Sequence, residues 1–166
     1  MNDGPGKVLL ATDGSPDAIL AARRAAGLAL AFGSELHLVH VIPASPPYSL
    51  FGETGEGPSV LEEDSGKARE LLDGEVERIE ELGGKVTKTY LRTGEPDAEI
   101  LALGEEIGAG TIVVGSRGLG PLARMPIGSV SSSVAGHAHC PVLVVRDHDS
   151  DEEGRPIIRG KTASTA

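Results

Sequence analysis

The chain has 166 residues, of which 39% are hydrophobic and 2% aromatic, and its formal net charge is −10. This length suits one domain with an aliphatic core. The negative charge repels nucleic-acid backbones and aromatic stacking platforms are scarce, so both features argue against nucleic-acid binding. They do not exclude a small anionic ligand, because backbone N–H groups bind phosphate whatever the net charge.

Five segments of the sequence are predicted to be β-strands. Four of them are short runs of Val, Ile and Leu without clean alternation, which is typical of strands buried on both faces of a parallel sheet. The third along the chain alternates and predicts a half-exposed strand. In chain order the predicted strands are Lys7–Thr12, Leu36–Ile42, Lys85–Leu91, Thr111–Gly115 and Pro141–Arg146.

Helical patterns fill the gaps between these strands. Ser15, Pro16 and Asp17 favour a helix start, since Ser caps the helix, Pro suits its first position and Asp suits the positive end of the dipole. Gly33 ends that helix. The other helices are predicted over about Val60–Leu82, Pro96–Ile107 and Ser129–His137. Strands that alternate with helices predict an α/β fold, a single open parallel sheet with helices on both faces.

The predicted helix over residues 60–82 carries an apolar stripe and a charged face. We interpret the charges from Glu62 to Glu81 as its solvated side. The stripe recurs at steps of three and four residues and consists of Ala68, Leu72, Val76, Ile79 and Leu82. Before the helix, Pro43–Ser59 predicts a long mobile loop. Residues 1–146 form the predicted domain, and the polar segment Asp147–Ala166 predicts a disordered tail.

A glycine-rich stretch follows the fourth predicted strand and leads into the last helix. Gly115, Gly118 and Gly120 allow sharp turns and close approach to a ligand, and Gly128 precedes Ser129 at the helix start. The first N–H groups of a helix lack internal partners and lie at its positive end, so this arrangement predicts an anion site. The spacing fits neither a P-loop nor the dinucleotide fingerprint, and alone it is equally consistent with a simple turn.

A second loop, Thr12–Ser15, ends the first predicted strand. In open α/β sheets, ligands bind beyond the carboxyl ends of strands where the strand order reverses. If the first and fourth strands are neighbours, this loop and the glycine-rich loop bound one crevice. Asp13 could accept a hydrogen bond from ribose or hold a metal ion on phosphates, and alone it could simply form a tight turn. Arg117 and Arg124 could reach a phosphate or remain solvated.

Three sequence features resemble the ATP-binding branch of the universal stress protein family. They are Ala11–Ser15, the pattern Gly115-x2-Gly118-x9-Gly128-Ser129, and the stretch 128–145, and the likeness covers about residues 5–146. The resemblance implies a Rossmann-like, adenine nucleotide hydrolase-like fold with strand order 3-2-1-4-5. It implies ATP as the ligand, with Mg²⁺ or Mn²⁺. With the loop chemistry above, the candidate binding residues are Ala11, Thr12, Asp13, Val41, Gly115, Arg117, Gly118, Gly128, Ser129, Val130 and Ser131.

The resemblance assigns parts of the ligand to these residues. Gly115, Gly118, Gly128 and Ser129 would bind ribose and phosphates, and Asp13 would touch the ribose or the metal. Adenine would lie against a pocket lined by Ala11, Thr12 and the backbone of Val41. The resemblance also implies a homodimer through antiparallel pairing of the last strand, Pro141–Arg146. An apolar strand edge is one that proteins usually cover, which favours the same surface.

Three hypotheses for function follow. The leading one is an ATP-binding stress-response or signalling module. The second is a slow ATPase or a self-phosphorylating protein, and the third is an interaction module without nucleotide. We predict no catalytic residue, because no Ser-His-Asp or Cys-His arrangement has supporting context.

The histidines and the cysteine have simpler explanations than a metal site. His137, His139 and Cys140 lie close together, but no second cluster completes four ligands. We expect His137 to meet helix carbonyls and Cys140 to be buried. We expect His37 and His40 to be surface or satisfied core histidines.

The chain carries no pattern for export or membrane insertion. Its start lacks a signal-peptide pattern, no apolar run reaches bilayer length, and one cysteine cannot form an intrachain disulfide. We therefore expect a soluble cytoplasmic protein that does not bind membranes.

Overall fold

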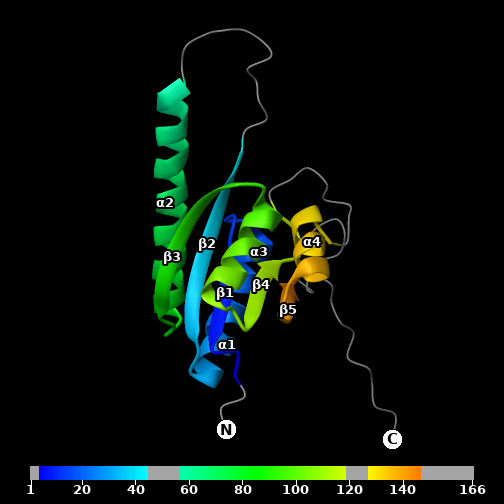
Figure 1. Cartoon of the computed structure of the whole chain (residues 1–166). Helices are drawn as coiled ribbons and strands as arrows, with labels where there is room; N and C mark the ends of the chain where they lie inside the picture. Colours follow the sequence, from blue (N-terminus) through cyan, green and yellow to red (C-terminus); the bar gives the residue numbers. More distant parts are fainter. Residues whose placement is uncertain (1–3, 45–56, 119–126, 147–166) are drawn as a thin grey trace, which may run out of the picture.

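The computed structural model describes residues 4–44, 57–118 and 127–146, with the backbone alone described for residues 57–63. Strands and helices alternate along the chain, as the sequence predicted (Figure 1). The elements are β1 (Lys7–Ala11), α1 (Pro16–Phe32), β2 (Glu35–Pro43), α2 (Gly57–Glu81), β3 (Val86–Gly94), α3 (Pro96–Ile107), β4 (Thr111–Gly115), α4 (Ser129–His137) and β5 (Val142–Val145).

The strands form one parallel sheet in the order β3-β2-β1-β4-β5, which confirms the predicted topology. β1 lies at the centre and pairs with β2 on one side and β4 on the other. The strand order reverses between β1 and β4, because the chain winds outward from β1 to β3 and then returns to β4. The carboxyl ends of β1 and β4 are therefore the expected place for a ligand.

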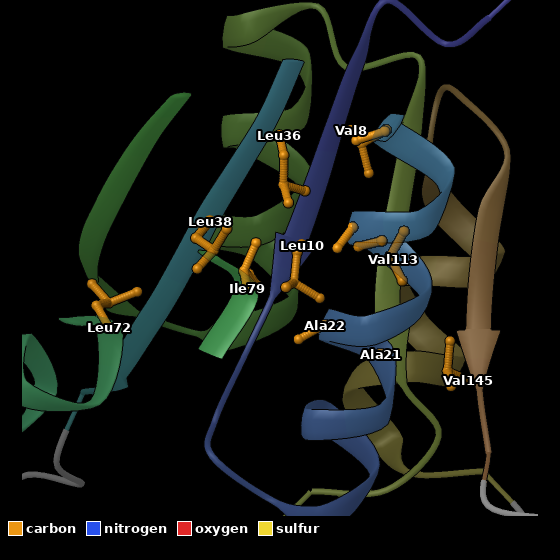
Figure 2. Close-up of a cluster of buried hydrophobic side chains, with 13 residues drawn as sticks. Val8, Leu10, Ala21, Ala22, Leu36, Leu38, Leu72, Ile79, Val113 and Val145 are labelled. Carbon is orange, nitrogen blue, oxygen red and sulfur yellow. The ribbon is translucent and has the colours of Figure 1, made fainter. Parts of the chain in front are cut away.

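Helices cover both faces of the sheet. Figure 1 views the face covered by α3 and α4, with α1 behind the sheet. The core between the sheet and helices α1 and α2 contains Leu10, Leu38 and Ile79 (Figure 2). On the other face, Leu9 and Val39 pack with Leu103 of α3. Neighbouring residues of one strand thus enter opposite cores, which explains the unbroken apolar runs in the sequence.

Helix α1 begins and ends where the sequence predicted. The Ser15 hydroxyl accepts the N–H of Ala18, Pro16 takes the first position, and Gly33 ends the helix with φ at 62°. Its buried face is made of small side chains, which lets the helix approach the sheet closely. Those residues are Ala18, Ala21, Ala22, Ala25, Ala26 and Ala29.

Three predicted boundaries need correction. Helix α2 begins at Gly57, so the last residues of the predicted loop Pro43–Ser59 are helical, while residues 45–56 lie outside the described part of the chain. Leu82, assigned to the buried stripe, lies beyond the end of α2 and is 43% exposed. β3 extends to Gly94 instead of Leu91, because it pairs along the length of β2. The predicted tail, Asp147–Ala166, also lies outside the described residues.

Glu75 contradicts the interpretation of α2 as having an entirely solvated charged face. It lies three residues after Leu72 and four before Ile79, on the stripe that meets the sheet, and it is only 3% exposed. Arg78 lies 3.7 Å from one carboxylate oxygen. Burial raises the pKa of the Glu75 carboxyl, and the nearby guanidinium only partly offsets this. Glu75 therefore belongs to the core, with its charge partly compensated.

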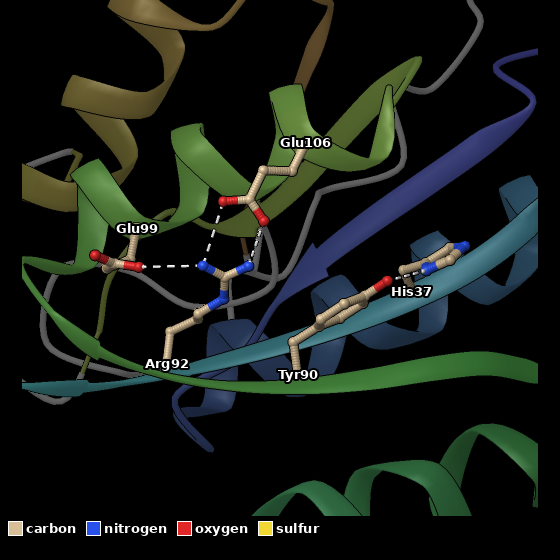
Figure 3. A network of polar contacts seen from close by, with 5 residues as sticks. All are labelled: His37, Tyr90, Arg92, Glu99 and Glu106. Carbon is tan, nitrogen blue, oxygen red and sulfur yellow. Dashed lines mark hydrogen bonds and ion pairs between the residues drawn. The ribbon is translucent and has the colours of Figure 1, made fainter.

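Polar contacts join the edge strand β3 to its neighbours (Figure 3). The guanidinium of Arg92 forms ion pairs with Glu106 and Glu99 of α3. On the same face, the Tyr90 hydroxyl lies 3.2 Å from Nδ1 of the buried His37. His37 is thus a satisfied core histidine, as predicted.

Candidate functional site

A cavity of about 570 Å³ opens at the carboxyl ends of β1 and β4. This volume falls in the usual range for small-molecule sites. Every candidate binding residue from the sequence analysis lines it. The cavity is also lined by residues that the sequence analysis did not assign: Ser15, Ala18, Val39, His40, Pro43, Pro96, Ile100 and Val114.

The cavity has an apolar wall and a polar wall. The apolar wall comes from strand ends and from α3, with Val39, Val41 and Ile100 as its main side chains. The polar wall comes from the β1–α1 loop, the loop after β4 and the first turn of α4. Such a cavity suits a ligand with a flat apolar part and a charged part.

The β1–α1 loop places the Asp13 carboxylate at the polar wall. The backbone of Thr12 is fixed at both ends. Its N–H donates to the carbonyl of Val39, and its carbonyl accepts from Nδ1 of His40 at 2.7 Å. Asp13 Oδ1 then accepts the N–H of Ser15 at 2.9 Å. His40 thus acts as a satisfied histidine that fixes the loop. The turn that was the alternative explanation for Asp13 is present, and it also orients the carboxylate.

A hydrogen bond links the two loops that bound the cavity. The Ser15 hydroxyl donates to the carbonyl of Arg117 at 3.2 Å while it also caps α1. Arg117 is half-buried and lines the cavity, whereas Arg124 and Gly120 lie outside the described residues. One buried serine therefore sets the distance between the loops.

Ser116 is the second link, and sequence reasoning missed it. Its carbonyl accepts the N–H of Gly128 at 2.6 Å and the hydroxyl of Ser131 at 3.0 Å. Its N–H donates to Val145 of β5, and its hydroxyl donates to Asp17 of α1. Ser116 is fully buried. These hydrogen bonds bring the start of α4 next to the end of β4, and they direct the Ser131 hydroxyl toward the carbonyl of Ser116.

The first turn of α4 faces the cavity without a capping side chain. Gly128 occupies the N-cap position with no side-chain hydrogen bond, and the first turn holds no acidic residue. The first bond within the helix runs from the N–H of Ser132 to the carbonyl of Gly128. The N–H groups of Ser129, Val130 and Ser131 therefore precede the helix ladder, at the positive end of its dipole. The sequence predicted an anion site at this helix start, and Gly128, Ser129, Val130 and Ser131 line the polar wall of the cavity.

Gly115 also lines the cavity, but its missing side chain serves packing. A Cβ at this position would lie 2.8 Å from main-chain atoms of Asp17 and Ala18 in α1. The close approach of α1 to β4 thus requires glycine here. No sequence signal separates this role from contact with a ligand.

The histidine and cysteine near the end of α4 are structural. Nδ1 of His137 donates to the carbonyl of Ser133, as predicted for a helix end. Cys140 is half-buried, less than expected, and burial raises the pKa of its thiol. Within the described ranges, no three metal-ligating side chains gather at one place. In the same ranges, no helix is both long and apolar enough to span a bilayer.

Asp13 is compatible with a metal ion that is bound mainly by the ligand. Mg²⁺ in nucleotide sites commonly takes one or two protein carboxylates and completes its shell with phosphates and water. A single carboxylate on the polar wall, close to the start of α4, fits that requirement.

Comparisons with known proteins place this chain in a family. The universal stress protein family model matches residues 5–146. A universal stress protein of Methanocaldococcus jannaschii is 35% identical over 140 residues, which are 84% of this chain and 81% of the relative. The structure of the universal stress protein UspA from Lactobacillus plantarum aligns with a TM-score of 0.75, and the alignment covers 87% of this chain and 100% of that one. At 22% identity it supports the fold alone.

A third similar protein was solved with a ligand. It is the universal stress protein from Archaeoglobus fulgidus in complex with dAMP, which is 27% identical, with a TM-score of 0.63, over 87% of this chain and 99% of that one. Since the family model spans most of the chain and a relative above 30% identity covers more than two thirds of it, this chain belongs to the universal stress protein family.

Proposed function

We propose that this chain is an ATP-binding module that acts in a stress response or in signalling. One observation carries the proposal: the uncapped first turn of α4 faces a cavity that also holds the Asp13 carboxylate and an apolar wall. A nucleotide has three parts that match these features. Its phosphates are anionic, its ribose carries hydroxyl groups and its phosphates can hold a metal ion, and its base is flat and largely apolar. The dAMP bound by the related Archaeoglobus fulgidus protein supports the choice of an adenine nucleotide.

Each part of the ligand has residues that suit it. The N–H groups of Ser129, Val130 and Ser131 would bind phosphate. Asp13 would accept from ribose or hold Mg²⁺ or Mn²⁺ on the phosphates. The apolar wall around Val41 would receive the adenine.

The described cavity favours binding over efficient hydrolysis. Its titratable side chains in the described ranges are Asp13, His40 and Arg117. Asp13 accepts a backbone N–H, and His40 donates to a backbone carbonyl, so both have positioning contacts. Occupancy would then act by favouring one of two states of the protein, which requires different ATP affinities in the two states.

We include a homodimer in this proposal, formed through β5. β5 lies at the edge of the sheet, and Leu143 on it is 40% exposed. Leu143→Lys should shift the protein toward monomer in sedimentation analysis, because a charge on an apolar edge opposes strand pairing. A monomeric wild type at micromolar concentration would remove the dimer from the proposal.

The experiment for ATP binding is calorimetric titration of purified protein with Mg²⁺–ATP. Gly128→Val should weaken binding strongly, because its side chain would cover the N–H groups at the start of α4 and crowd the carbonyl of Ser116. Gly136→Ala is the matched control, since a Cβ there meets open space. Equal affinities for wild type and Gly128→Val would exclude this site.

Hydrolysis is tested separately, by phosphate release in the presence of Mg²⁺. Release above a blank without protein that is lost in Asp13→Ala would favour the slow ATPase. Absence of release from a protein that binds ATP would favour the binding module.

A further inference from the structure

Gly118 belongs to the loop after β4, and its backbone does not explain why glycine stands there. Its φ lies outside the left-handed region. Among the described residues, the glycines with positive φ are Gly6, Gly14, Gly33, Gly83, Gly94 and Gly108. The reason for glycine at 118 must be sought in its surroundings.

The surroundings of Gly118 are the carboxylate of Asp13. A Cβ at position 118 would lie 2.5 Å from Asp13 Oδ2 and 3.7 Å from Cγ. No other atom of the described residues outside the chain neighbours would lie within 4 Å of it. Since 2.5 Å is far below an ordinary carbon–oxygen contact, any side chain at 118 would push the carboxylate or the loop aside.

The carboxylate is held where this contact would occur. Asp13 Oδ1 accepts the N–H of Ser15, which directs Oδ2 toward Gly118. Ser15 is itself 2% exposed, and its hydroxyl donates to the carbonyl of Arg117, the residue before Gly118. The two loops are thus joined directly beside the contact, so a Cβ at 118 would have to turn the carboxylate or strain the hydrogen bonds that hold it.

The geometry points to Gly118 as a positioning residue that acts through Asp13. Because residue 118 has no side chain, the carboxylate of Asp13 has room to lie at the polar wall of the cavity. This inference rests on the proposed nucleotide site and deepens it. From the sequence alone, the glycines of this loop predict close approach to a ligand. At position 118 the space that a Cβ would need is taken by the carboxylate of Asp13, so the absence of a side chain there would affect the ligand through Asp13.

A double-mutant cycle on Mg²⁺–ATP affinity tests this coupling. Gly118→Ala and Asp13→Ala should each weaken binding about tenfold or more, because each removes or displaces a charge-assisted contact. The double variant should bind no more weakly than Asp13→Ala alone, since the alanine at 118 then has nothing to displace. Gly136→Ala should bind as the wild type does. If the two single losses multiply in the double variant, Gly118 acts on the ligand independently and the inference is overturned.

A second cycle measures the same contact without nucleotide. Gly118→Ala should lower the Tm of the ligand-free protein by a few degrees when Asp13 is present, and by much less in the Asp13→Ala background. Equal decreases in both backgrounds would overturn the inference. Should the wild type bind no ATP at all, the proposed function fails, while this second cycle still decides whether Gly118 accommodates Asp13.

Discussion

Helices α1 and α4 begin beside the same cavity, yet their first turns differ. At α1, the Ser15 hydroxyl accepts the N–H of Ala18, and Asp17 adds a negative charge. At α4, Gly128 offers no side chain and the first turn holds no acid. The start of α1 is completed by its own residues, whereas the start of α4 is left for another partner.

The difference separates a helix start that is completed by its own residues from the one to which we assign the phosphates in our proposal. Relative to glycine, a capping serine contributes roughly a few tenths of a kcal/mol, so the uncapped α4 forgoes only this small stabilisation. An anion bound there would recover it, because a ligand that binds only the folded state raises its stability. A missing cap beside a cavity is therefore a sign of a binding site, while a missing cap on an exposed helix is not.

The largest expected effect comes from making α4 resemble α1. Ser129→Asp places a carboxylate in the first turn of α4, as Asp17 does in α1. ATP affinity should fall about 100-fold, because the fixed charge occupies the positive end of the dipole and repels phosphate. The ligand-free protein should keep its Tm or gain slightly. Titration calorimetry and thermal unfolding measure the two effects.

Ser129→Asn is the matched control for this variant. It has nearly the same shape without the charge, and Ser129 is exposed, so the fold should tolerate it. If the Asp and Asn variants bind ATP equally well, the start of α4 does not bind the phosphates.

A smaller effect should follow from removing the cap of α1. Ser15→Ala should reduce the free energy of unfolding by about 2 kcal/mol, because the variant loses both the buried cap and the half-buried hydrogen bond to Arg117. Ser129→Ala, at the exposed start of α4, should change it by less than about 0.5 kcal/mol. Urea unfolding of both variants gives the comparison, and equal losses would mean that Ser15 is no more structural than Ser129.

The sequence predicts those features that depend on neighbours along the chain. Ser15, Pro16 and Gly33 mark the ends of α1 through local backbone chemistry, and the apolar runs mark the buried strands. The candidate site could be predicted for the same reason, since its two loops follow strands whose order the fold class restricts. Local signals indicated the two loops of the site, whereas Ala11, Thr12 and Val41 came from the family resemblance.

The remaining features depend on contacts between distant parts of the chain. Ser116 bonds to Asp17, which is 99 residues away, and no local pattern announces that bond. The glycine pattern did not show that Gly115 makes room for α1 or that Gly118 makes room for Asp13. Glu75 is a residue type that is usually exposed, and it is buried only because of how α2 packs on the sheet.

The smallest predicted effect concerns a hydrogen bond between α4 and α3, away from the first turn of α4. The Ser133 hydroxyl donates to Asp97 of α3 at 2.6 Å. That hydrogen bond lowers the pKa of the Asp97 carboxyl, with further help from the N–H of Ala98. Because the pKa in the folded state is below the ordinary value of 3.8, the stabilisation is present above pH 3.8 and is lost as pH falls through the folded value.

Ser133→Ala should therefore destabilise the protein by about 1 kcal/mol at pH 7, and by less near pH 3. Urea unfolding at both pH values measures the change, with the exposed neighbour Ser132→Ala as a control that should alter neither value. A loss of equal size at pH 7 and pH 3 would contradict an interaction with ionised Asp97. A smaller decrease in the free energy of unfolding at low pH would show that a charge-assisted hydrogen bond holds α4 against α3. Helix α1, by contrast, is stabilised at its start by its own cap.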